Sequence, residues 1–212
     1  ISAGSEPILA QALTRARVVY GDGGFGRDVL AAIDQAAYGL DWKPEIADDI
    51  QTMRERVQAS GSRRDLKRGY GGIVDIEFLV QMFRLKYGRV HPEVRQPNTW
   101  QALAACRAAS LLSEAEYAAL KDCYDFLRLV ESRLRIYHNR SLDELPEQPE
   151  ELEKLARRLR LDPALGQTPV QRFQEELERH AQQTRTLFLE VFARERYWNR
   201  RASALPVRRM SL

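Results

Sequence analysis

Apolar residues recur three and four positions apart along most of this chain, which predicts helices nearly throughout. The longest regular pattern opens with a capping box at Ser113 and Glu116 and continues as an apolar seam over about three heptads. Asp22 is expected to cap another helix. The expected helices cover about residues 9–20, 23–39, 44–58, 74–90, 98–110, 114–137, 149–159 and 169–191. No segment alternates as a strand would, so we predict an all-α fold, a helical bundle of seven or eight helices.

Residues 60–72 interrupt this pattern. Three glycines, Gly69, Gly71 and Gly72, lie within four positions, which is too many for a stable helix interior. Two apolar stripes then run side by side from Val74 to Val90. A helix that is apolar on so much of its surface is expected at the centre of a fold. The sequence therefore predicts a glycine-rich loop that leads into a buried central helix.

The composition fits a folded, cytoplasmic protein. Of the 212 residues, 44% are hydrophobic and 30% are charged. No apolar run approaches the roughly 18 residues that a membrane-spanning helix needs. Two cysteines suit neither a disulfide framework nor a zinc site, and the three histidines are far apart, so no metal site is predicted. The chain begins at Ile1 without a signal peptide, and we expect it to be a piece of a longer protein.

Positive charge is concentrated at the C-terminus. The net charge is +3, and residues 194–212 contain six arginines and one glutamate. We expect residues 1–193 to form the helical domain and residues 194–212 to be a basic tail that is partly disordered. Such a tail could contact nucleic acid. A solvated terminus is the simpler explanation, because the tail has a single aromatic pair, Tyr197–Trp198.

The glycine-rich loop is the first candidate for binding chemistry. A glycine-rich loop before a helix can hold phosphate through backbone N–H groups and the helix dipole. Two cations, Lys67 and Arg68, precede Gly71 and Gly72. The motif is neither a Walker A loop nor a dinucleotide fingerprint. A tight structural turn and a phosphate contact are therefore both open. Arg15 and Arg17 likewise either complement a helix dipole or reach a phosphate on a neighbouring domain.

Asp75 and Glu77 form a D-x-E pattern directly after the loop. On a helix two residues so spaced diverge by about 200°, so we do not expect them to share a metal ion. Asp75 should instead be stabilised by the helix dipole, and Glu77 by a cation such as Lys67 or Arg68. A second set of structural ion pairs is expected on one helix face, at Arg128, Glu131 and Arg135.

Three segments occur together in one order: residues 12–22 (ALTRARVVYGD), 65–81 (DLKRGYGGIVDIEFLVQ) and 126–134 (FLRLVESRL). They resemble glutamine-synthetase adenylyltransferase, also called glutamate–ammonia-ligase adenylyltransferase. The resemblance covers about residues 8–190, and K-x-G-x-G-G-I-x-D-I-E-F is its most specific part. A shorter form of this element occurs in the related PII uridylyltransferases, whose helical domain is the alternative.

The resemblance implies a helical domain that follows a nucleotidyltransferase domain of the DNA polymerase beta type. The parent enzyme would regulate nitrogen assimilation by transferring AMP from ATP to a tyrosine of glutamine synthetase and removing it by phosphorolysis, with Mg²⁺ and ATP. The wording Ile-Val-Asp-Ile-Glu-Phe implies the C-terminal, adenylylating half. The implied partners are the upstream nucleotidyltransferase domain, the other half of the same chain, glutamine synthetase and the PII signal protein.

One departure from the family limits the chemistry expected here. The catalytic Gly-Ser and Asp-x-Asp of the family precede the Ala-Leu-Thr-Arg-Ala-Arg element and are missing. Nucleotidyl transfer needs such carboxylates to fix metal ions, so we predict no catalytic residue and an inactive isolated chain. The expected role is accessory and regulatory, with Lys67 or Arg68 near the triphosphate and Gly71–Gly72 admitting a close backbone approach. A pure protein-interaction module is the alternative, and nucleic-acid binding is the least favoured.

Overall fold

The computed structural model describes residues 6–138, 143–162 and 164–202. These residues form eight α-helices, one short 3-10 helix and no strand, which confirms the all-α prediction. The α-helices are α1 (Glu6–Leu13), α2 (Gly23–Tyr38), α3 (Pro44–Ala59), α4 (Ile73–Tyr87), α5 (Thr99–Ala108), α6 (Glu114–His138), α7 (Pro149–Leu159) and α8 (Pro169–Ala202), and the 3-10 helix η1 is Pro92–Val94. None of the helices that the described residues form is long and apolar enough to cross a membrane.

Local capping explains where several helices begin. The Asp22 carboxylate accepts the Gly24 N–H at 2.7 Å at the start of α2, as predicted. The capping box of α6 is also confirmed, because the Ser113 N–H donates to the Glu116 carboxylate at 2.7 Å and the Glu116 N–H donates to Ser113 Oγ at 3.2 Å. These starts depend on neighbours in sequence, so the sequence alone could place them.

The central buried helix is confirmed as α4. Twelve of its 15 residues are buried, and it packs against α1, α2, α3, α5, α6 and α8. Fully buried side chains such as Leu79 and Phe83 each contribute roughly 1.5–3 kcal/mol of hydrophobic stabilisation. The core of the fold is therefore built around this helix.

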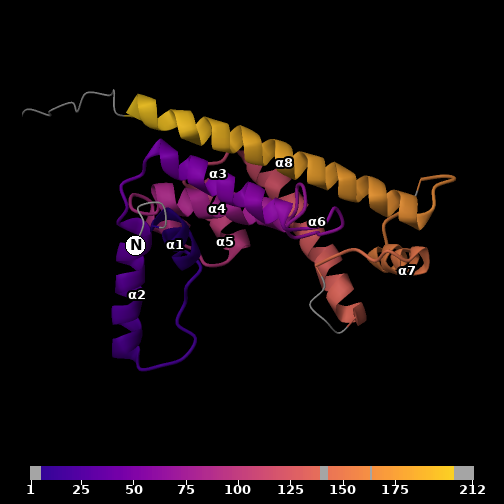
Figure 1. Cartoon of the computed structure of the whole chain (residues 1–212), viewed down its shortest axis with the longest axis horizontal. Coiled ribbons are helices and arrows are strands. Elements are labelled where there is room, and N and C mark those ends of the chain that lie inside the picture. Colours follow the sequence, from indigo (N-terminus) through magenta and orange to yellow (C-terminus); the bar gives the residue numbers. More distant parts are fainter. Residues whose placement is uncertain (1–5, 139–142, 163, 203–212) are drawn as a thin grey trace, which may run out of the picture.

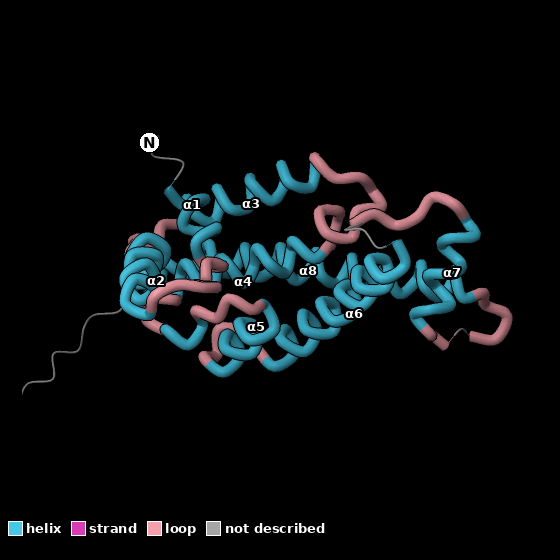
Figure 2. Tube along the Cα trace, turned by 90° about the horizontal axis from the view of Figure 1, so that it is seen from below, coloured by secondary structure: helices cyan, strands magenta, loops and turns pink. Residues whose placement is uncertain are grey.

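α8 is a long helix that runs along one side of the molecule and packs against α3, α4, α6 and α7 (Figure 1). α2, at the left of the view, and the end of α6, farther right and before α7, both project away from α8 (Figure 1). Figure 2 looks from below and shows α4 and α8 between α3 on one side and α5 and α6 on the other. The glycine-rich loop joins α3 to α4, so it lies against the middle of this arrangement.

The first helix is shorter than predicted. α1 ends at Leu13, so the expected helical stripe as far as Tyr20 is wrong, and Tyr20 is 99% exposed. The Thr14 carbonyl, which a longer helix would use, instead accepts a bond from Arg84 Nη1 at 3.4 Å. The β-branched pair Val18–Val19 also disfavours a helix. The helix therefore ends where α4 contacts its last turn and where β-branched residues follow.

The last helix is longer than the expected domain, because α8 continues past residue 193. The Glu195 carboxylate is buried and accepts bonds from Lys86 Nζ at 2.8 Å and from the Tyr87 hydroxyl at 2.5 Å. A buried ammonium group needs a carboxylate partner, so residues 194–196 pack on the domain rather than beginning a free tail. The partial disorder expected of the tail otherwise concerns residues 203–212, which lie outside the described residues.

Candidate functional site

The glycine-rich loop, residues 60–72, is held by a distant segment of the chain. The Leu66 N–H donates to the Asp143 carbonyl at 2.8 Å. The Leu145 N–H donates to the Arg64 carbonyl at 2.9 Å, which completes a short antiparallel bridge. This pairing holds the loop through backbone hydrogen bonds from the side of the α6–α7 connection.

The backbone N–H groups at the start of α4 are already occupied. They donate to carbonyl groups at 3.0–3.2 Å in the pairs Gly72 to Gly69, Ile73 to Leu66, Val74 to Lys67 and Asp75 to Gly72. A helix N-terminus binds an anion through N–H groups that lack such partners. Of the two explanations open from the sequence, this geometry supports the structural turn.

Gly71 and Gly72 make room for protein backbone. Gly71 has a φ of +63°, and a Cβ there would lie 1.9 Å from the carbonyl oxygen of Ala181 on α8. A Cβ on Gly72 would lie 2.6 Å from the carbonyl oxygen of Leu66. The positive φ and the close approach of α8 both require glycine at position 71. The space that a side chain at either glycine would occupy is therefore filled by protein backbone, not left open for a ligand.

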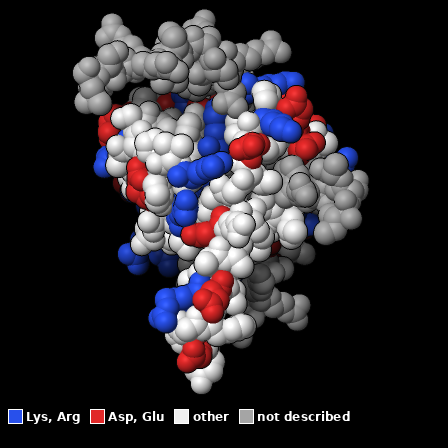
Figure 3. All heavy atoms as spheres, turned by 90° about the vertical axis from the view of Figure 1, so that its left-hand side faces the viewer, with Lys and Arg blue, Asp and Glu red and all other residues white. Residues whose placement is uncertain are grey.

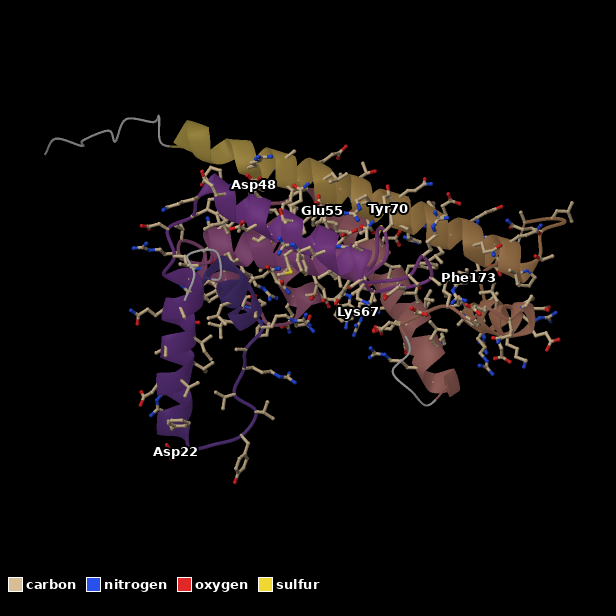
Figure 4. The ribbon with its side chains drawn as sticks, in the orientation of Figure 1. Asp22, Asp48, Glu55, Lys67, Tyr70 and Phe173 are labelled. Atoms are coloured by element: carbon tan, nitrogen blue, oxygen red, sulfur yellow. The ribbon has the colours of Figure 1, made fainter. Side chains whose placement is uncertain are left out.

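Lys67 and Arg68, the two cations directly before the glycines, differ in their surroundings. Arg68 Nε lies 2.6 Å from the buried carboxylate of Asp65. Lys67 makes no ion pair with a described residue. Figure 4 shows Lys67 on the opposite side of the loop from Tyr70, which lies beside α8. Of these two, Lys67 is thus the cation whose charge is available to a ligand.

Asp75 lies at the centre of a fully buried ion cluster. Arg54 Nε donates to its carboxylate, and Arg185 Nη1 lies 3.5 Å from the same oxygen. Arg54 also donates to the Gly69 carbonyl at 2.7 Å. Burial raises the pKa of Asp75, whereas the two arginines lower it. The helix dipole expected from the sequence is therefore supplemented by two arginines, and the cluster joins α3, the loop, α4 and α8.

Glu77 pairs with Arg15, so the prediction that Lys67 or Arg68 would hold it is wrong. Arg15 Nη1 lies 3.0 Å from Glu77 Oε2; the glutamate side chain is 8% exposed and the arginine side chain 53%. The early end of α1 brings Arg15 to this face of α4. Asp75 faces other partners, as the helical rotation requires, and the described residues contain no group of three or more His, Cys, Asp or Glu that could hold a metal ion.

On α6, the carboxylate of Glu131 is buried between two arginines. Arg128 Nη1 and Arg135 Nη2 each lie 2.7 Å from it. Glu131 is 4% exposed and Arg128 34%. The Arg128 guanidinium also lies over the rings of Trp100 at 5.8 Å and Tyr124 at 5.9 Å, in cation–π geometry. The three residues predicted as a structural ion-paired face therefore do form ion pairs, with both arginines still partly in solvent.

Sequence reasoning missed Trp100, Tyr124 and Arg84. No motif joins these residues, because each comes from a different helix and only the packing of α4, α5 and α6 brings them together. Arg17, which was a candidate beside Arg15, is exposed and forms no ion pair with a described residue. Arg15 and Arg17, which lie two positions apart in the sequence, therefore differ in the structure, because only Arg15 pairs with a described carboxylate.

A cavity of about 620 Å³ lies on the α8 side of the loop. Its walls include Leu66 from the loop, Leu127 from α6 and Leu177 from α8, with Tyr70 and Arg63 also lining it. Neither Lys67 nor Arg68 is among its described lining residues. Lys67 and Arg68 therefore lie outside the cavity, whereas the exposed Arg63 lines it.

Comparison with known proteins shows where similar sequences occur. Residues 45–192 match a family model described as GlnD PII-uridylyltransferase. The chain is also similar to proteins named bifunctional glutamine synthetase adenylyltransferase/adenylyl-removing enzyme. Identity is 33% over 188 residues with the Streptomyces avermitilis protein (87% of this chain, 18% of that protein), 33% over 190 residues with the Streptomyces coelicolor protein (87% and 18%), and 34% over 145 residues with the Mycobacterium leprae protein (66% and 14%). The chain thus spans 18% or less of the length of these relatives.

Proposed function

This chain belongs to the GlnD PII-uridylyltransferase family, and we propose that it serves as a helical domain of a bifunctional glutamine synthetase adenylyltransferase/adenylyl-removing enzyme. The observation that carries the proposal is the 33% identity over 87% of the chain. These relatives confirm the resemblance that the three sequence segments indicated. The parent enzyme would attach AMP to glutamine synthetase and remove it, and so regulate nitrogen assimilation.

In this proposal the domain supplies no reacting group. The carboxylates that hold Mg²⁺ on ATP would come from a nucleotidyltransferase domain elsewhere in the same polypeptide. The described residues do not fit a metal site of their own, so no step is assigned to Mg²⁺ on this chain. The partly exposed cations Lys67, Arg15 and Arg128 fit the phosphates of ATP, because fixed positive charge stabilises the charge that develops on a transferring phosphoryl group.

The proposed partners are the nucleotidyltransferase domain, the other half of the parent chain, glutamine synthetase and the PII signal protein. The names of the relatives support glutamine synthetase, and the description of the family model supports PII. Uridylyl transfer to PII is the second candidate function, because that family model matches most of the chain.

A protein-interaction role is the alternative, and α2 supports it. Apolar side chains are exposed on α2 and the segment before it, among them Val19, Tyr20 and Phe25. Figure 3 shows this end of the molecule, where the projecting lower part carries few charged side chains. Such a surface suits protein contact, and the alternative would leave the cations without a role in catalysis.

The experiment uses the longer polypeptide that includes the preceding domain. We expect it to transfer AMP from ATP to glutamine synthetase, and the isolated 212-residue chain to transfer none. Lys67→Ala should lower the rate roughly tenfold, the loss of one charge-assisted contact to phosphate. Lys43→Ala is the matched control, because Lys43 is an exposed lysine at the other end of α3.

Three outcomes would count against all or part of this proposal. A longer polypeptide that transfers UMP from UTP to PII, and no AMP to glutamine synthetase, would establish the second candidate function. Wild-type AMP transfer by Lys67→Ala would remove Lys67 from the site. Binding of glutamine synthetase that depends on Phe25 but not on ATP would favour the interaction module.

A further inference from the structure

A hollow of about 510 Å³ lies near the C-terminal ends of α6 and α7, and it shares no described lining residue with the cavity beside the glycine-rich loop. Its described lining residues are Arg133 and Ile136 from α6, Arg158 from α7, and Arg160 directly after α7. α7 packs against α6, and Figure 1 shows α7 at the opposite end of the molecule from α2. Three arginines and no carboxylate therefore line one hollow within the described part of the chain.

These arginines differ from most others on the surface in how their charge is used. All three are exposed. Arg133 and Arg160 form no ion pair with a described residue, whereas Arg157, also exposed on α7, pairs with Glu153 at 2.7 Å. Like charges that line one hollow repel, although water weakens the repulsion. The grouping therefore adds nothing to the stability of the fold, and it leaves guanidinium donors open to a ligand.

The backbone at position 160 is also unfavourable for an arginine. Arg160 ends α7 in the left-handed region, with a φ of +53° and a ψ of +36°. Glycine is the usual residue at such a helix end, because a Cβ disfavours this conformation. Arg157 and Arg158 in the last turn already complement the dipole of α7. Helix capping therefore does not explain an arginine at position 160, and a role for its charge in binding does.

We propose that this hollow is a docking surface for an acidic peptide segment of a partner protein, whose carboxylates pair with Arg133, Arg158 and Arg160. A planar guanidinium group can donate two parallel N–H bonds to one carboxylate. Ile136 lies beside the arginines and is 70% exposed, so it offers an apolar contact as well. A peptide supplies both carboxylates and an apolar side chain, whereas a small anion supplies charge alone. The inference does not depend on the proposed function.

A nucleic acid fits this surface less well. α7 begins with Glu150 and Glu151, and Glu153 follows. A long phosphate backbone that left the hollow along α7 would meet these like charges. The described lining residues also include no aromatic ring on which a base could stack. A short acidic segment needs only the hollow itself.

The test is fluorescence anisotropy of a labelled peptide, acetyl-Glu-Asp-Leu-Glu-Glu-Leu-Asp-Glu-amide, titrated with the 212-residue chain at low salt. We expect binding that weakens as salt is added. The neutral analogue, with Gln for Glu and Asn for Asp, should bind at least about tenfold more weakly. Unlabelled oligothymidylate and inorganic phosphate are the competitors. Displacement of the peptide by either competitor at a lower concentration than by unlabelled peptide would overturn the proposal, as would equal binding of the neutral analogue.

Variants locate the binding. Arg133→Gln and Arg160→Gln should each weaken peptide binding about fivefold. Arg27→Gln is the matched control and should change affinity less than about twofold, because Arg27 is exposed on α2 and forms no ion pair with a described residue. Ile136→Ser should weaken binding of the leucine-containing peptide more than binding of a peptide with serine in place of leucine. Equal losses in the three glutamine variants, or wild-type affinity in both Arg133→Gln and Arg160→Gln, would overturn the proposal.

One further variant separates binding from folding. Arg160→Gly removes the charge but suits the left-handed backbone at this helix end better than arginine does. Its thermal midpoint should therefore stay level or rise, while its affinity for the peptide falls as far as that of Arg160→Gln. A midpoint and an affinity that fall together would assign Arg160 a structural role and overturn its place in the docking surface.

Discussion

Asp75 and Glu77 are two residues apart on α4, and both carboxylates are buried, yet their ion pairs differ. Arg54, the partner of Asp75, is fully buried, whereas Arg15, the partner of Glu77, is mostly in solvent. The helical rotation between the two positions turns Asp75 toward α3 and α8 and Glu77 toward the end of α1. Exposure of the cation, rather than of the carboxylate, therefore separates a structural ion pair from one that can also meet a ligand.

The most direct test of this difference is to remove each carboxylate in turn. Asp75→Asn would leave Arg54 and Arg185 buried without a counter-charge, and we expect a loss of about 3–5 kcal/mol in the free energy of unfolding. Glu77→Gln should cost only about 1 kcal/mol, because water can solvate Arg15. Urea denaturation of the two variants measures both values. Similar losses in the free energy of unfolding would show that the exposure of the arginine does not determine what each ion pair contributes to stability.

The loop above Asp75 offers a second, smaller test. Gly71→Ala would strain a φ of +63° and place a methyl group against the Ala181 carbonyl, so we expect a loss of at least about 2 kcal/mol. Gly166→Ala is the control, since Gly166 has a φ of +80° and no atom within 4 Å of the added Cβ, and should cost about 1 kcal/mol. Equal losses in the two variants would mean that α8 shifts to make room for the added methyl group, so that its close approach does not restrict position 71.

The smallest effect concerns a buried group that stays neutral. His180 on α8 stacks on Phe126 at 4.2 Å, and burial, then the charge of Arg179, lower its pKa from the ordinary value of 6.5. The unfolded chain takes up the proton at a higher pH than the folded chain does, so stability falls as the pH drops below about 6.5. Asp122 and Glu176 also face the ring and moderate this shift.

Thermal unfolding at about pH 7.5 and about pH 5.5 measures the effect. The midpoint of His180→Phe, which keeps an aromatic ring against Phe126, should fall less between these pH values than that of wild type. An equal fall in both proteins would assign the acid sensitivity to groups other than His180.

Much of the fold could be predicted because it depends on neighbours in sequence. Asp22 and the Ser113–Glu116 box start their helices through bonds that span two or three residues. The two errors at the ends of the chain both involve long-range contacts. Arg84 takes the carbonyl that would have continued α1, and Lys86 holds Glu195 beyond the expected end of the domain. Neither partner can be inferred from helical spacing.

The candidate site was predicted less completely. Lys67 and Arg15 were identified as cations that could reach phosphate, and the structure leaves both partly accessible. The glycines looked equally suited to a ligand, but a sequence does not reveal that α8 lies against Gly71. Arg128 was expected to be structural, because the rings of Trp100 and Tyr124 become its neighbours only when α5 and α6 pack.

The sequence by itself determined an all-helical chain, a glycine-rich break before an apolar central helix, and the family to which the chain belongs. Periodicity, caps and motifs are local properties, so they can be recognised before any packing is known. Only the tertiary structure decided which arginine meets which carboxylate and which arginines stay in contact with solvent. Arg15 and Glu77 are 62 positions apart, and electrostatic interaction depends on distance and burial in space rather than on separation along the chain.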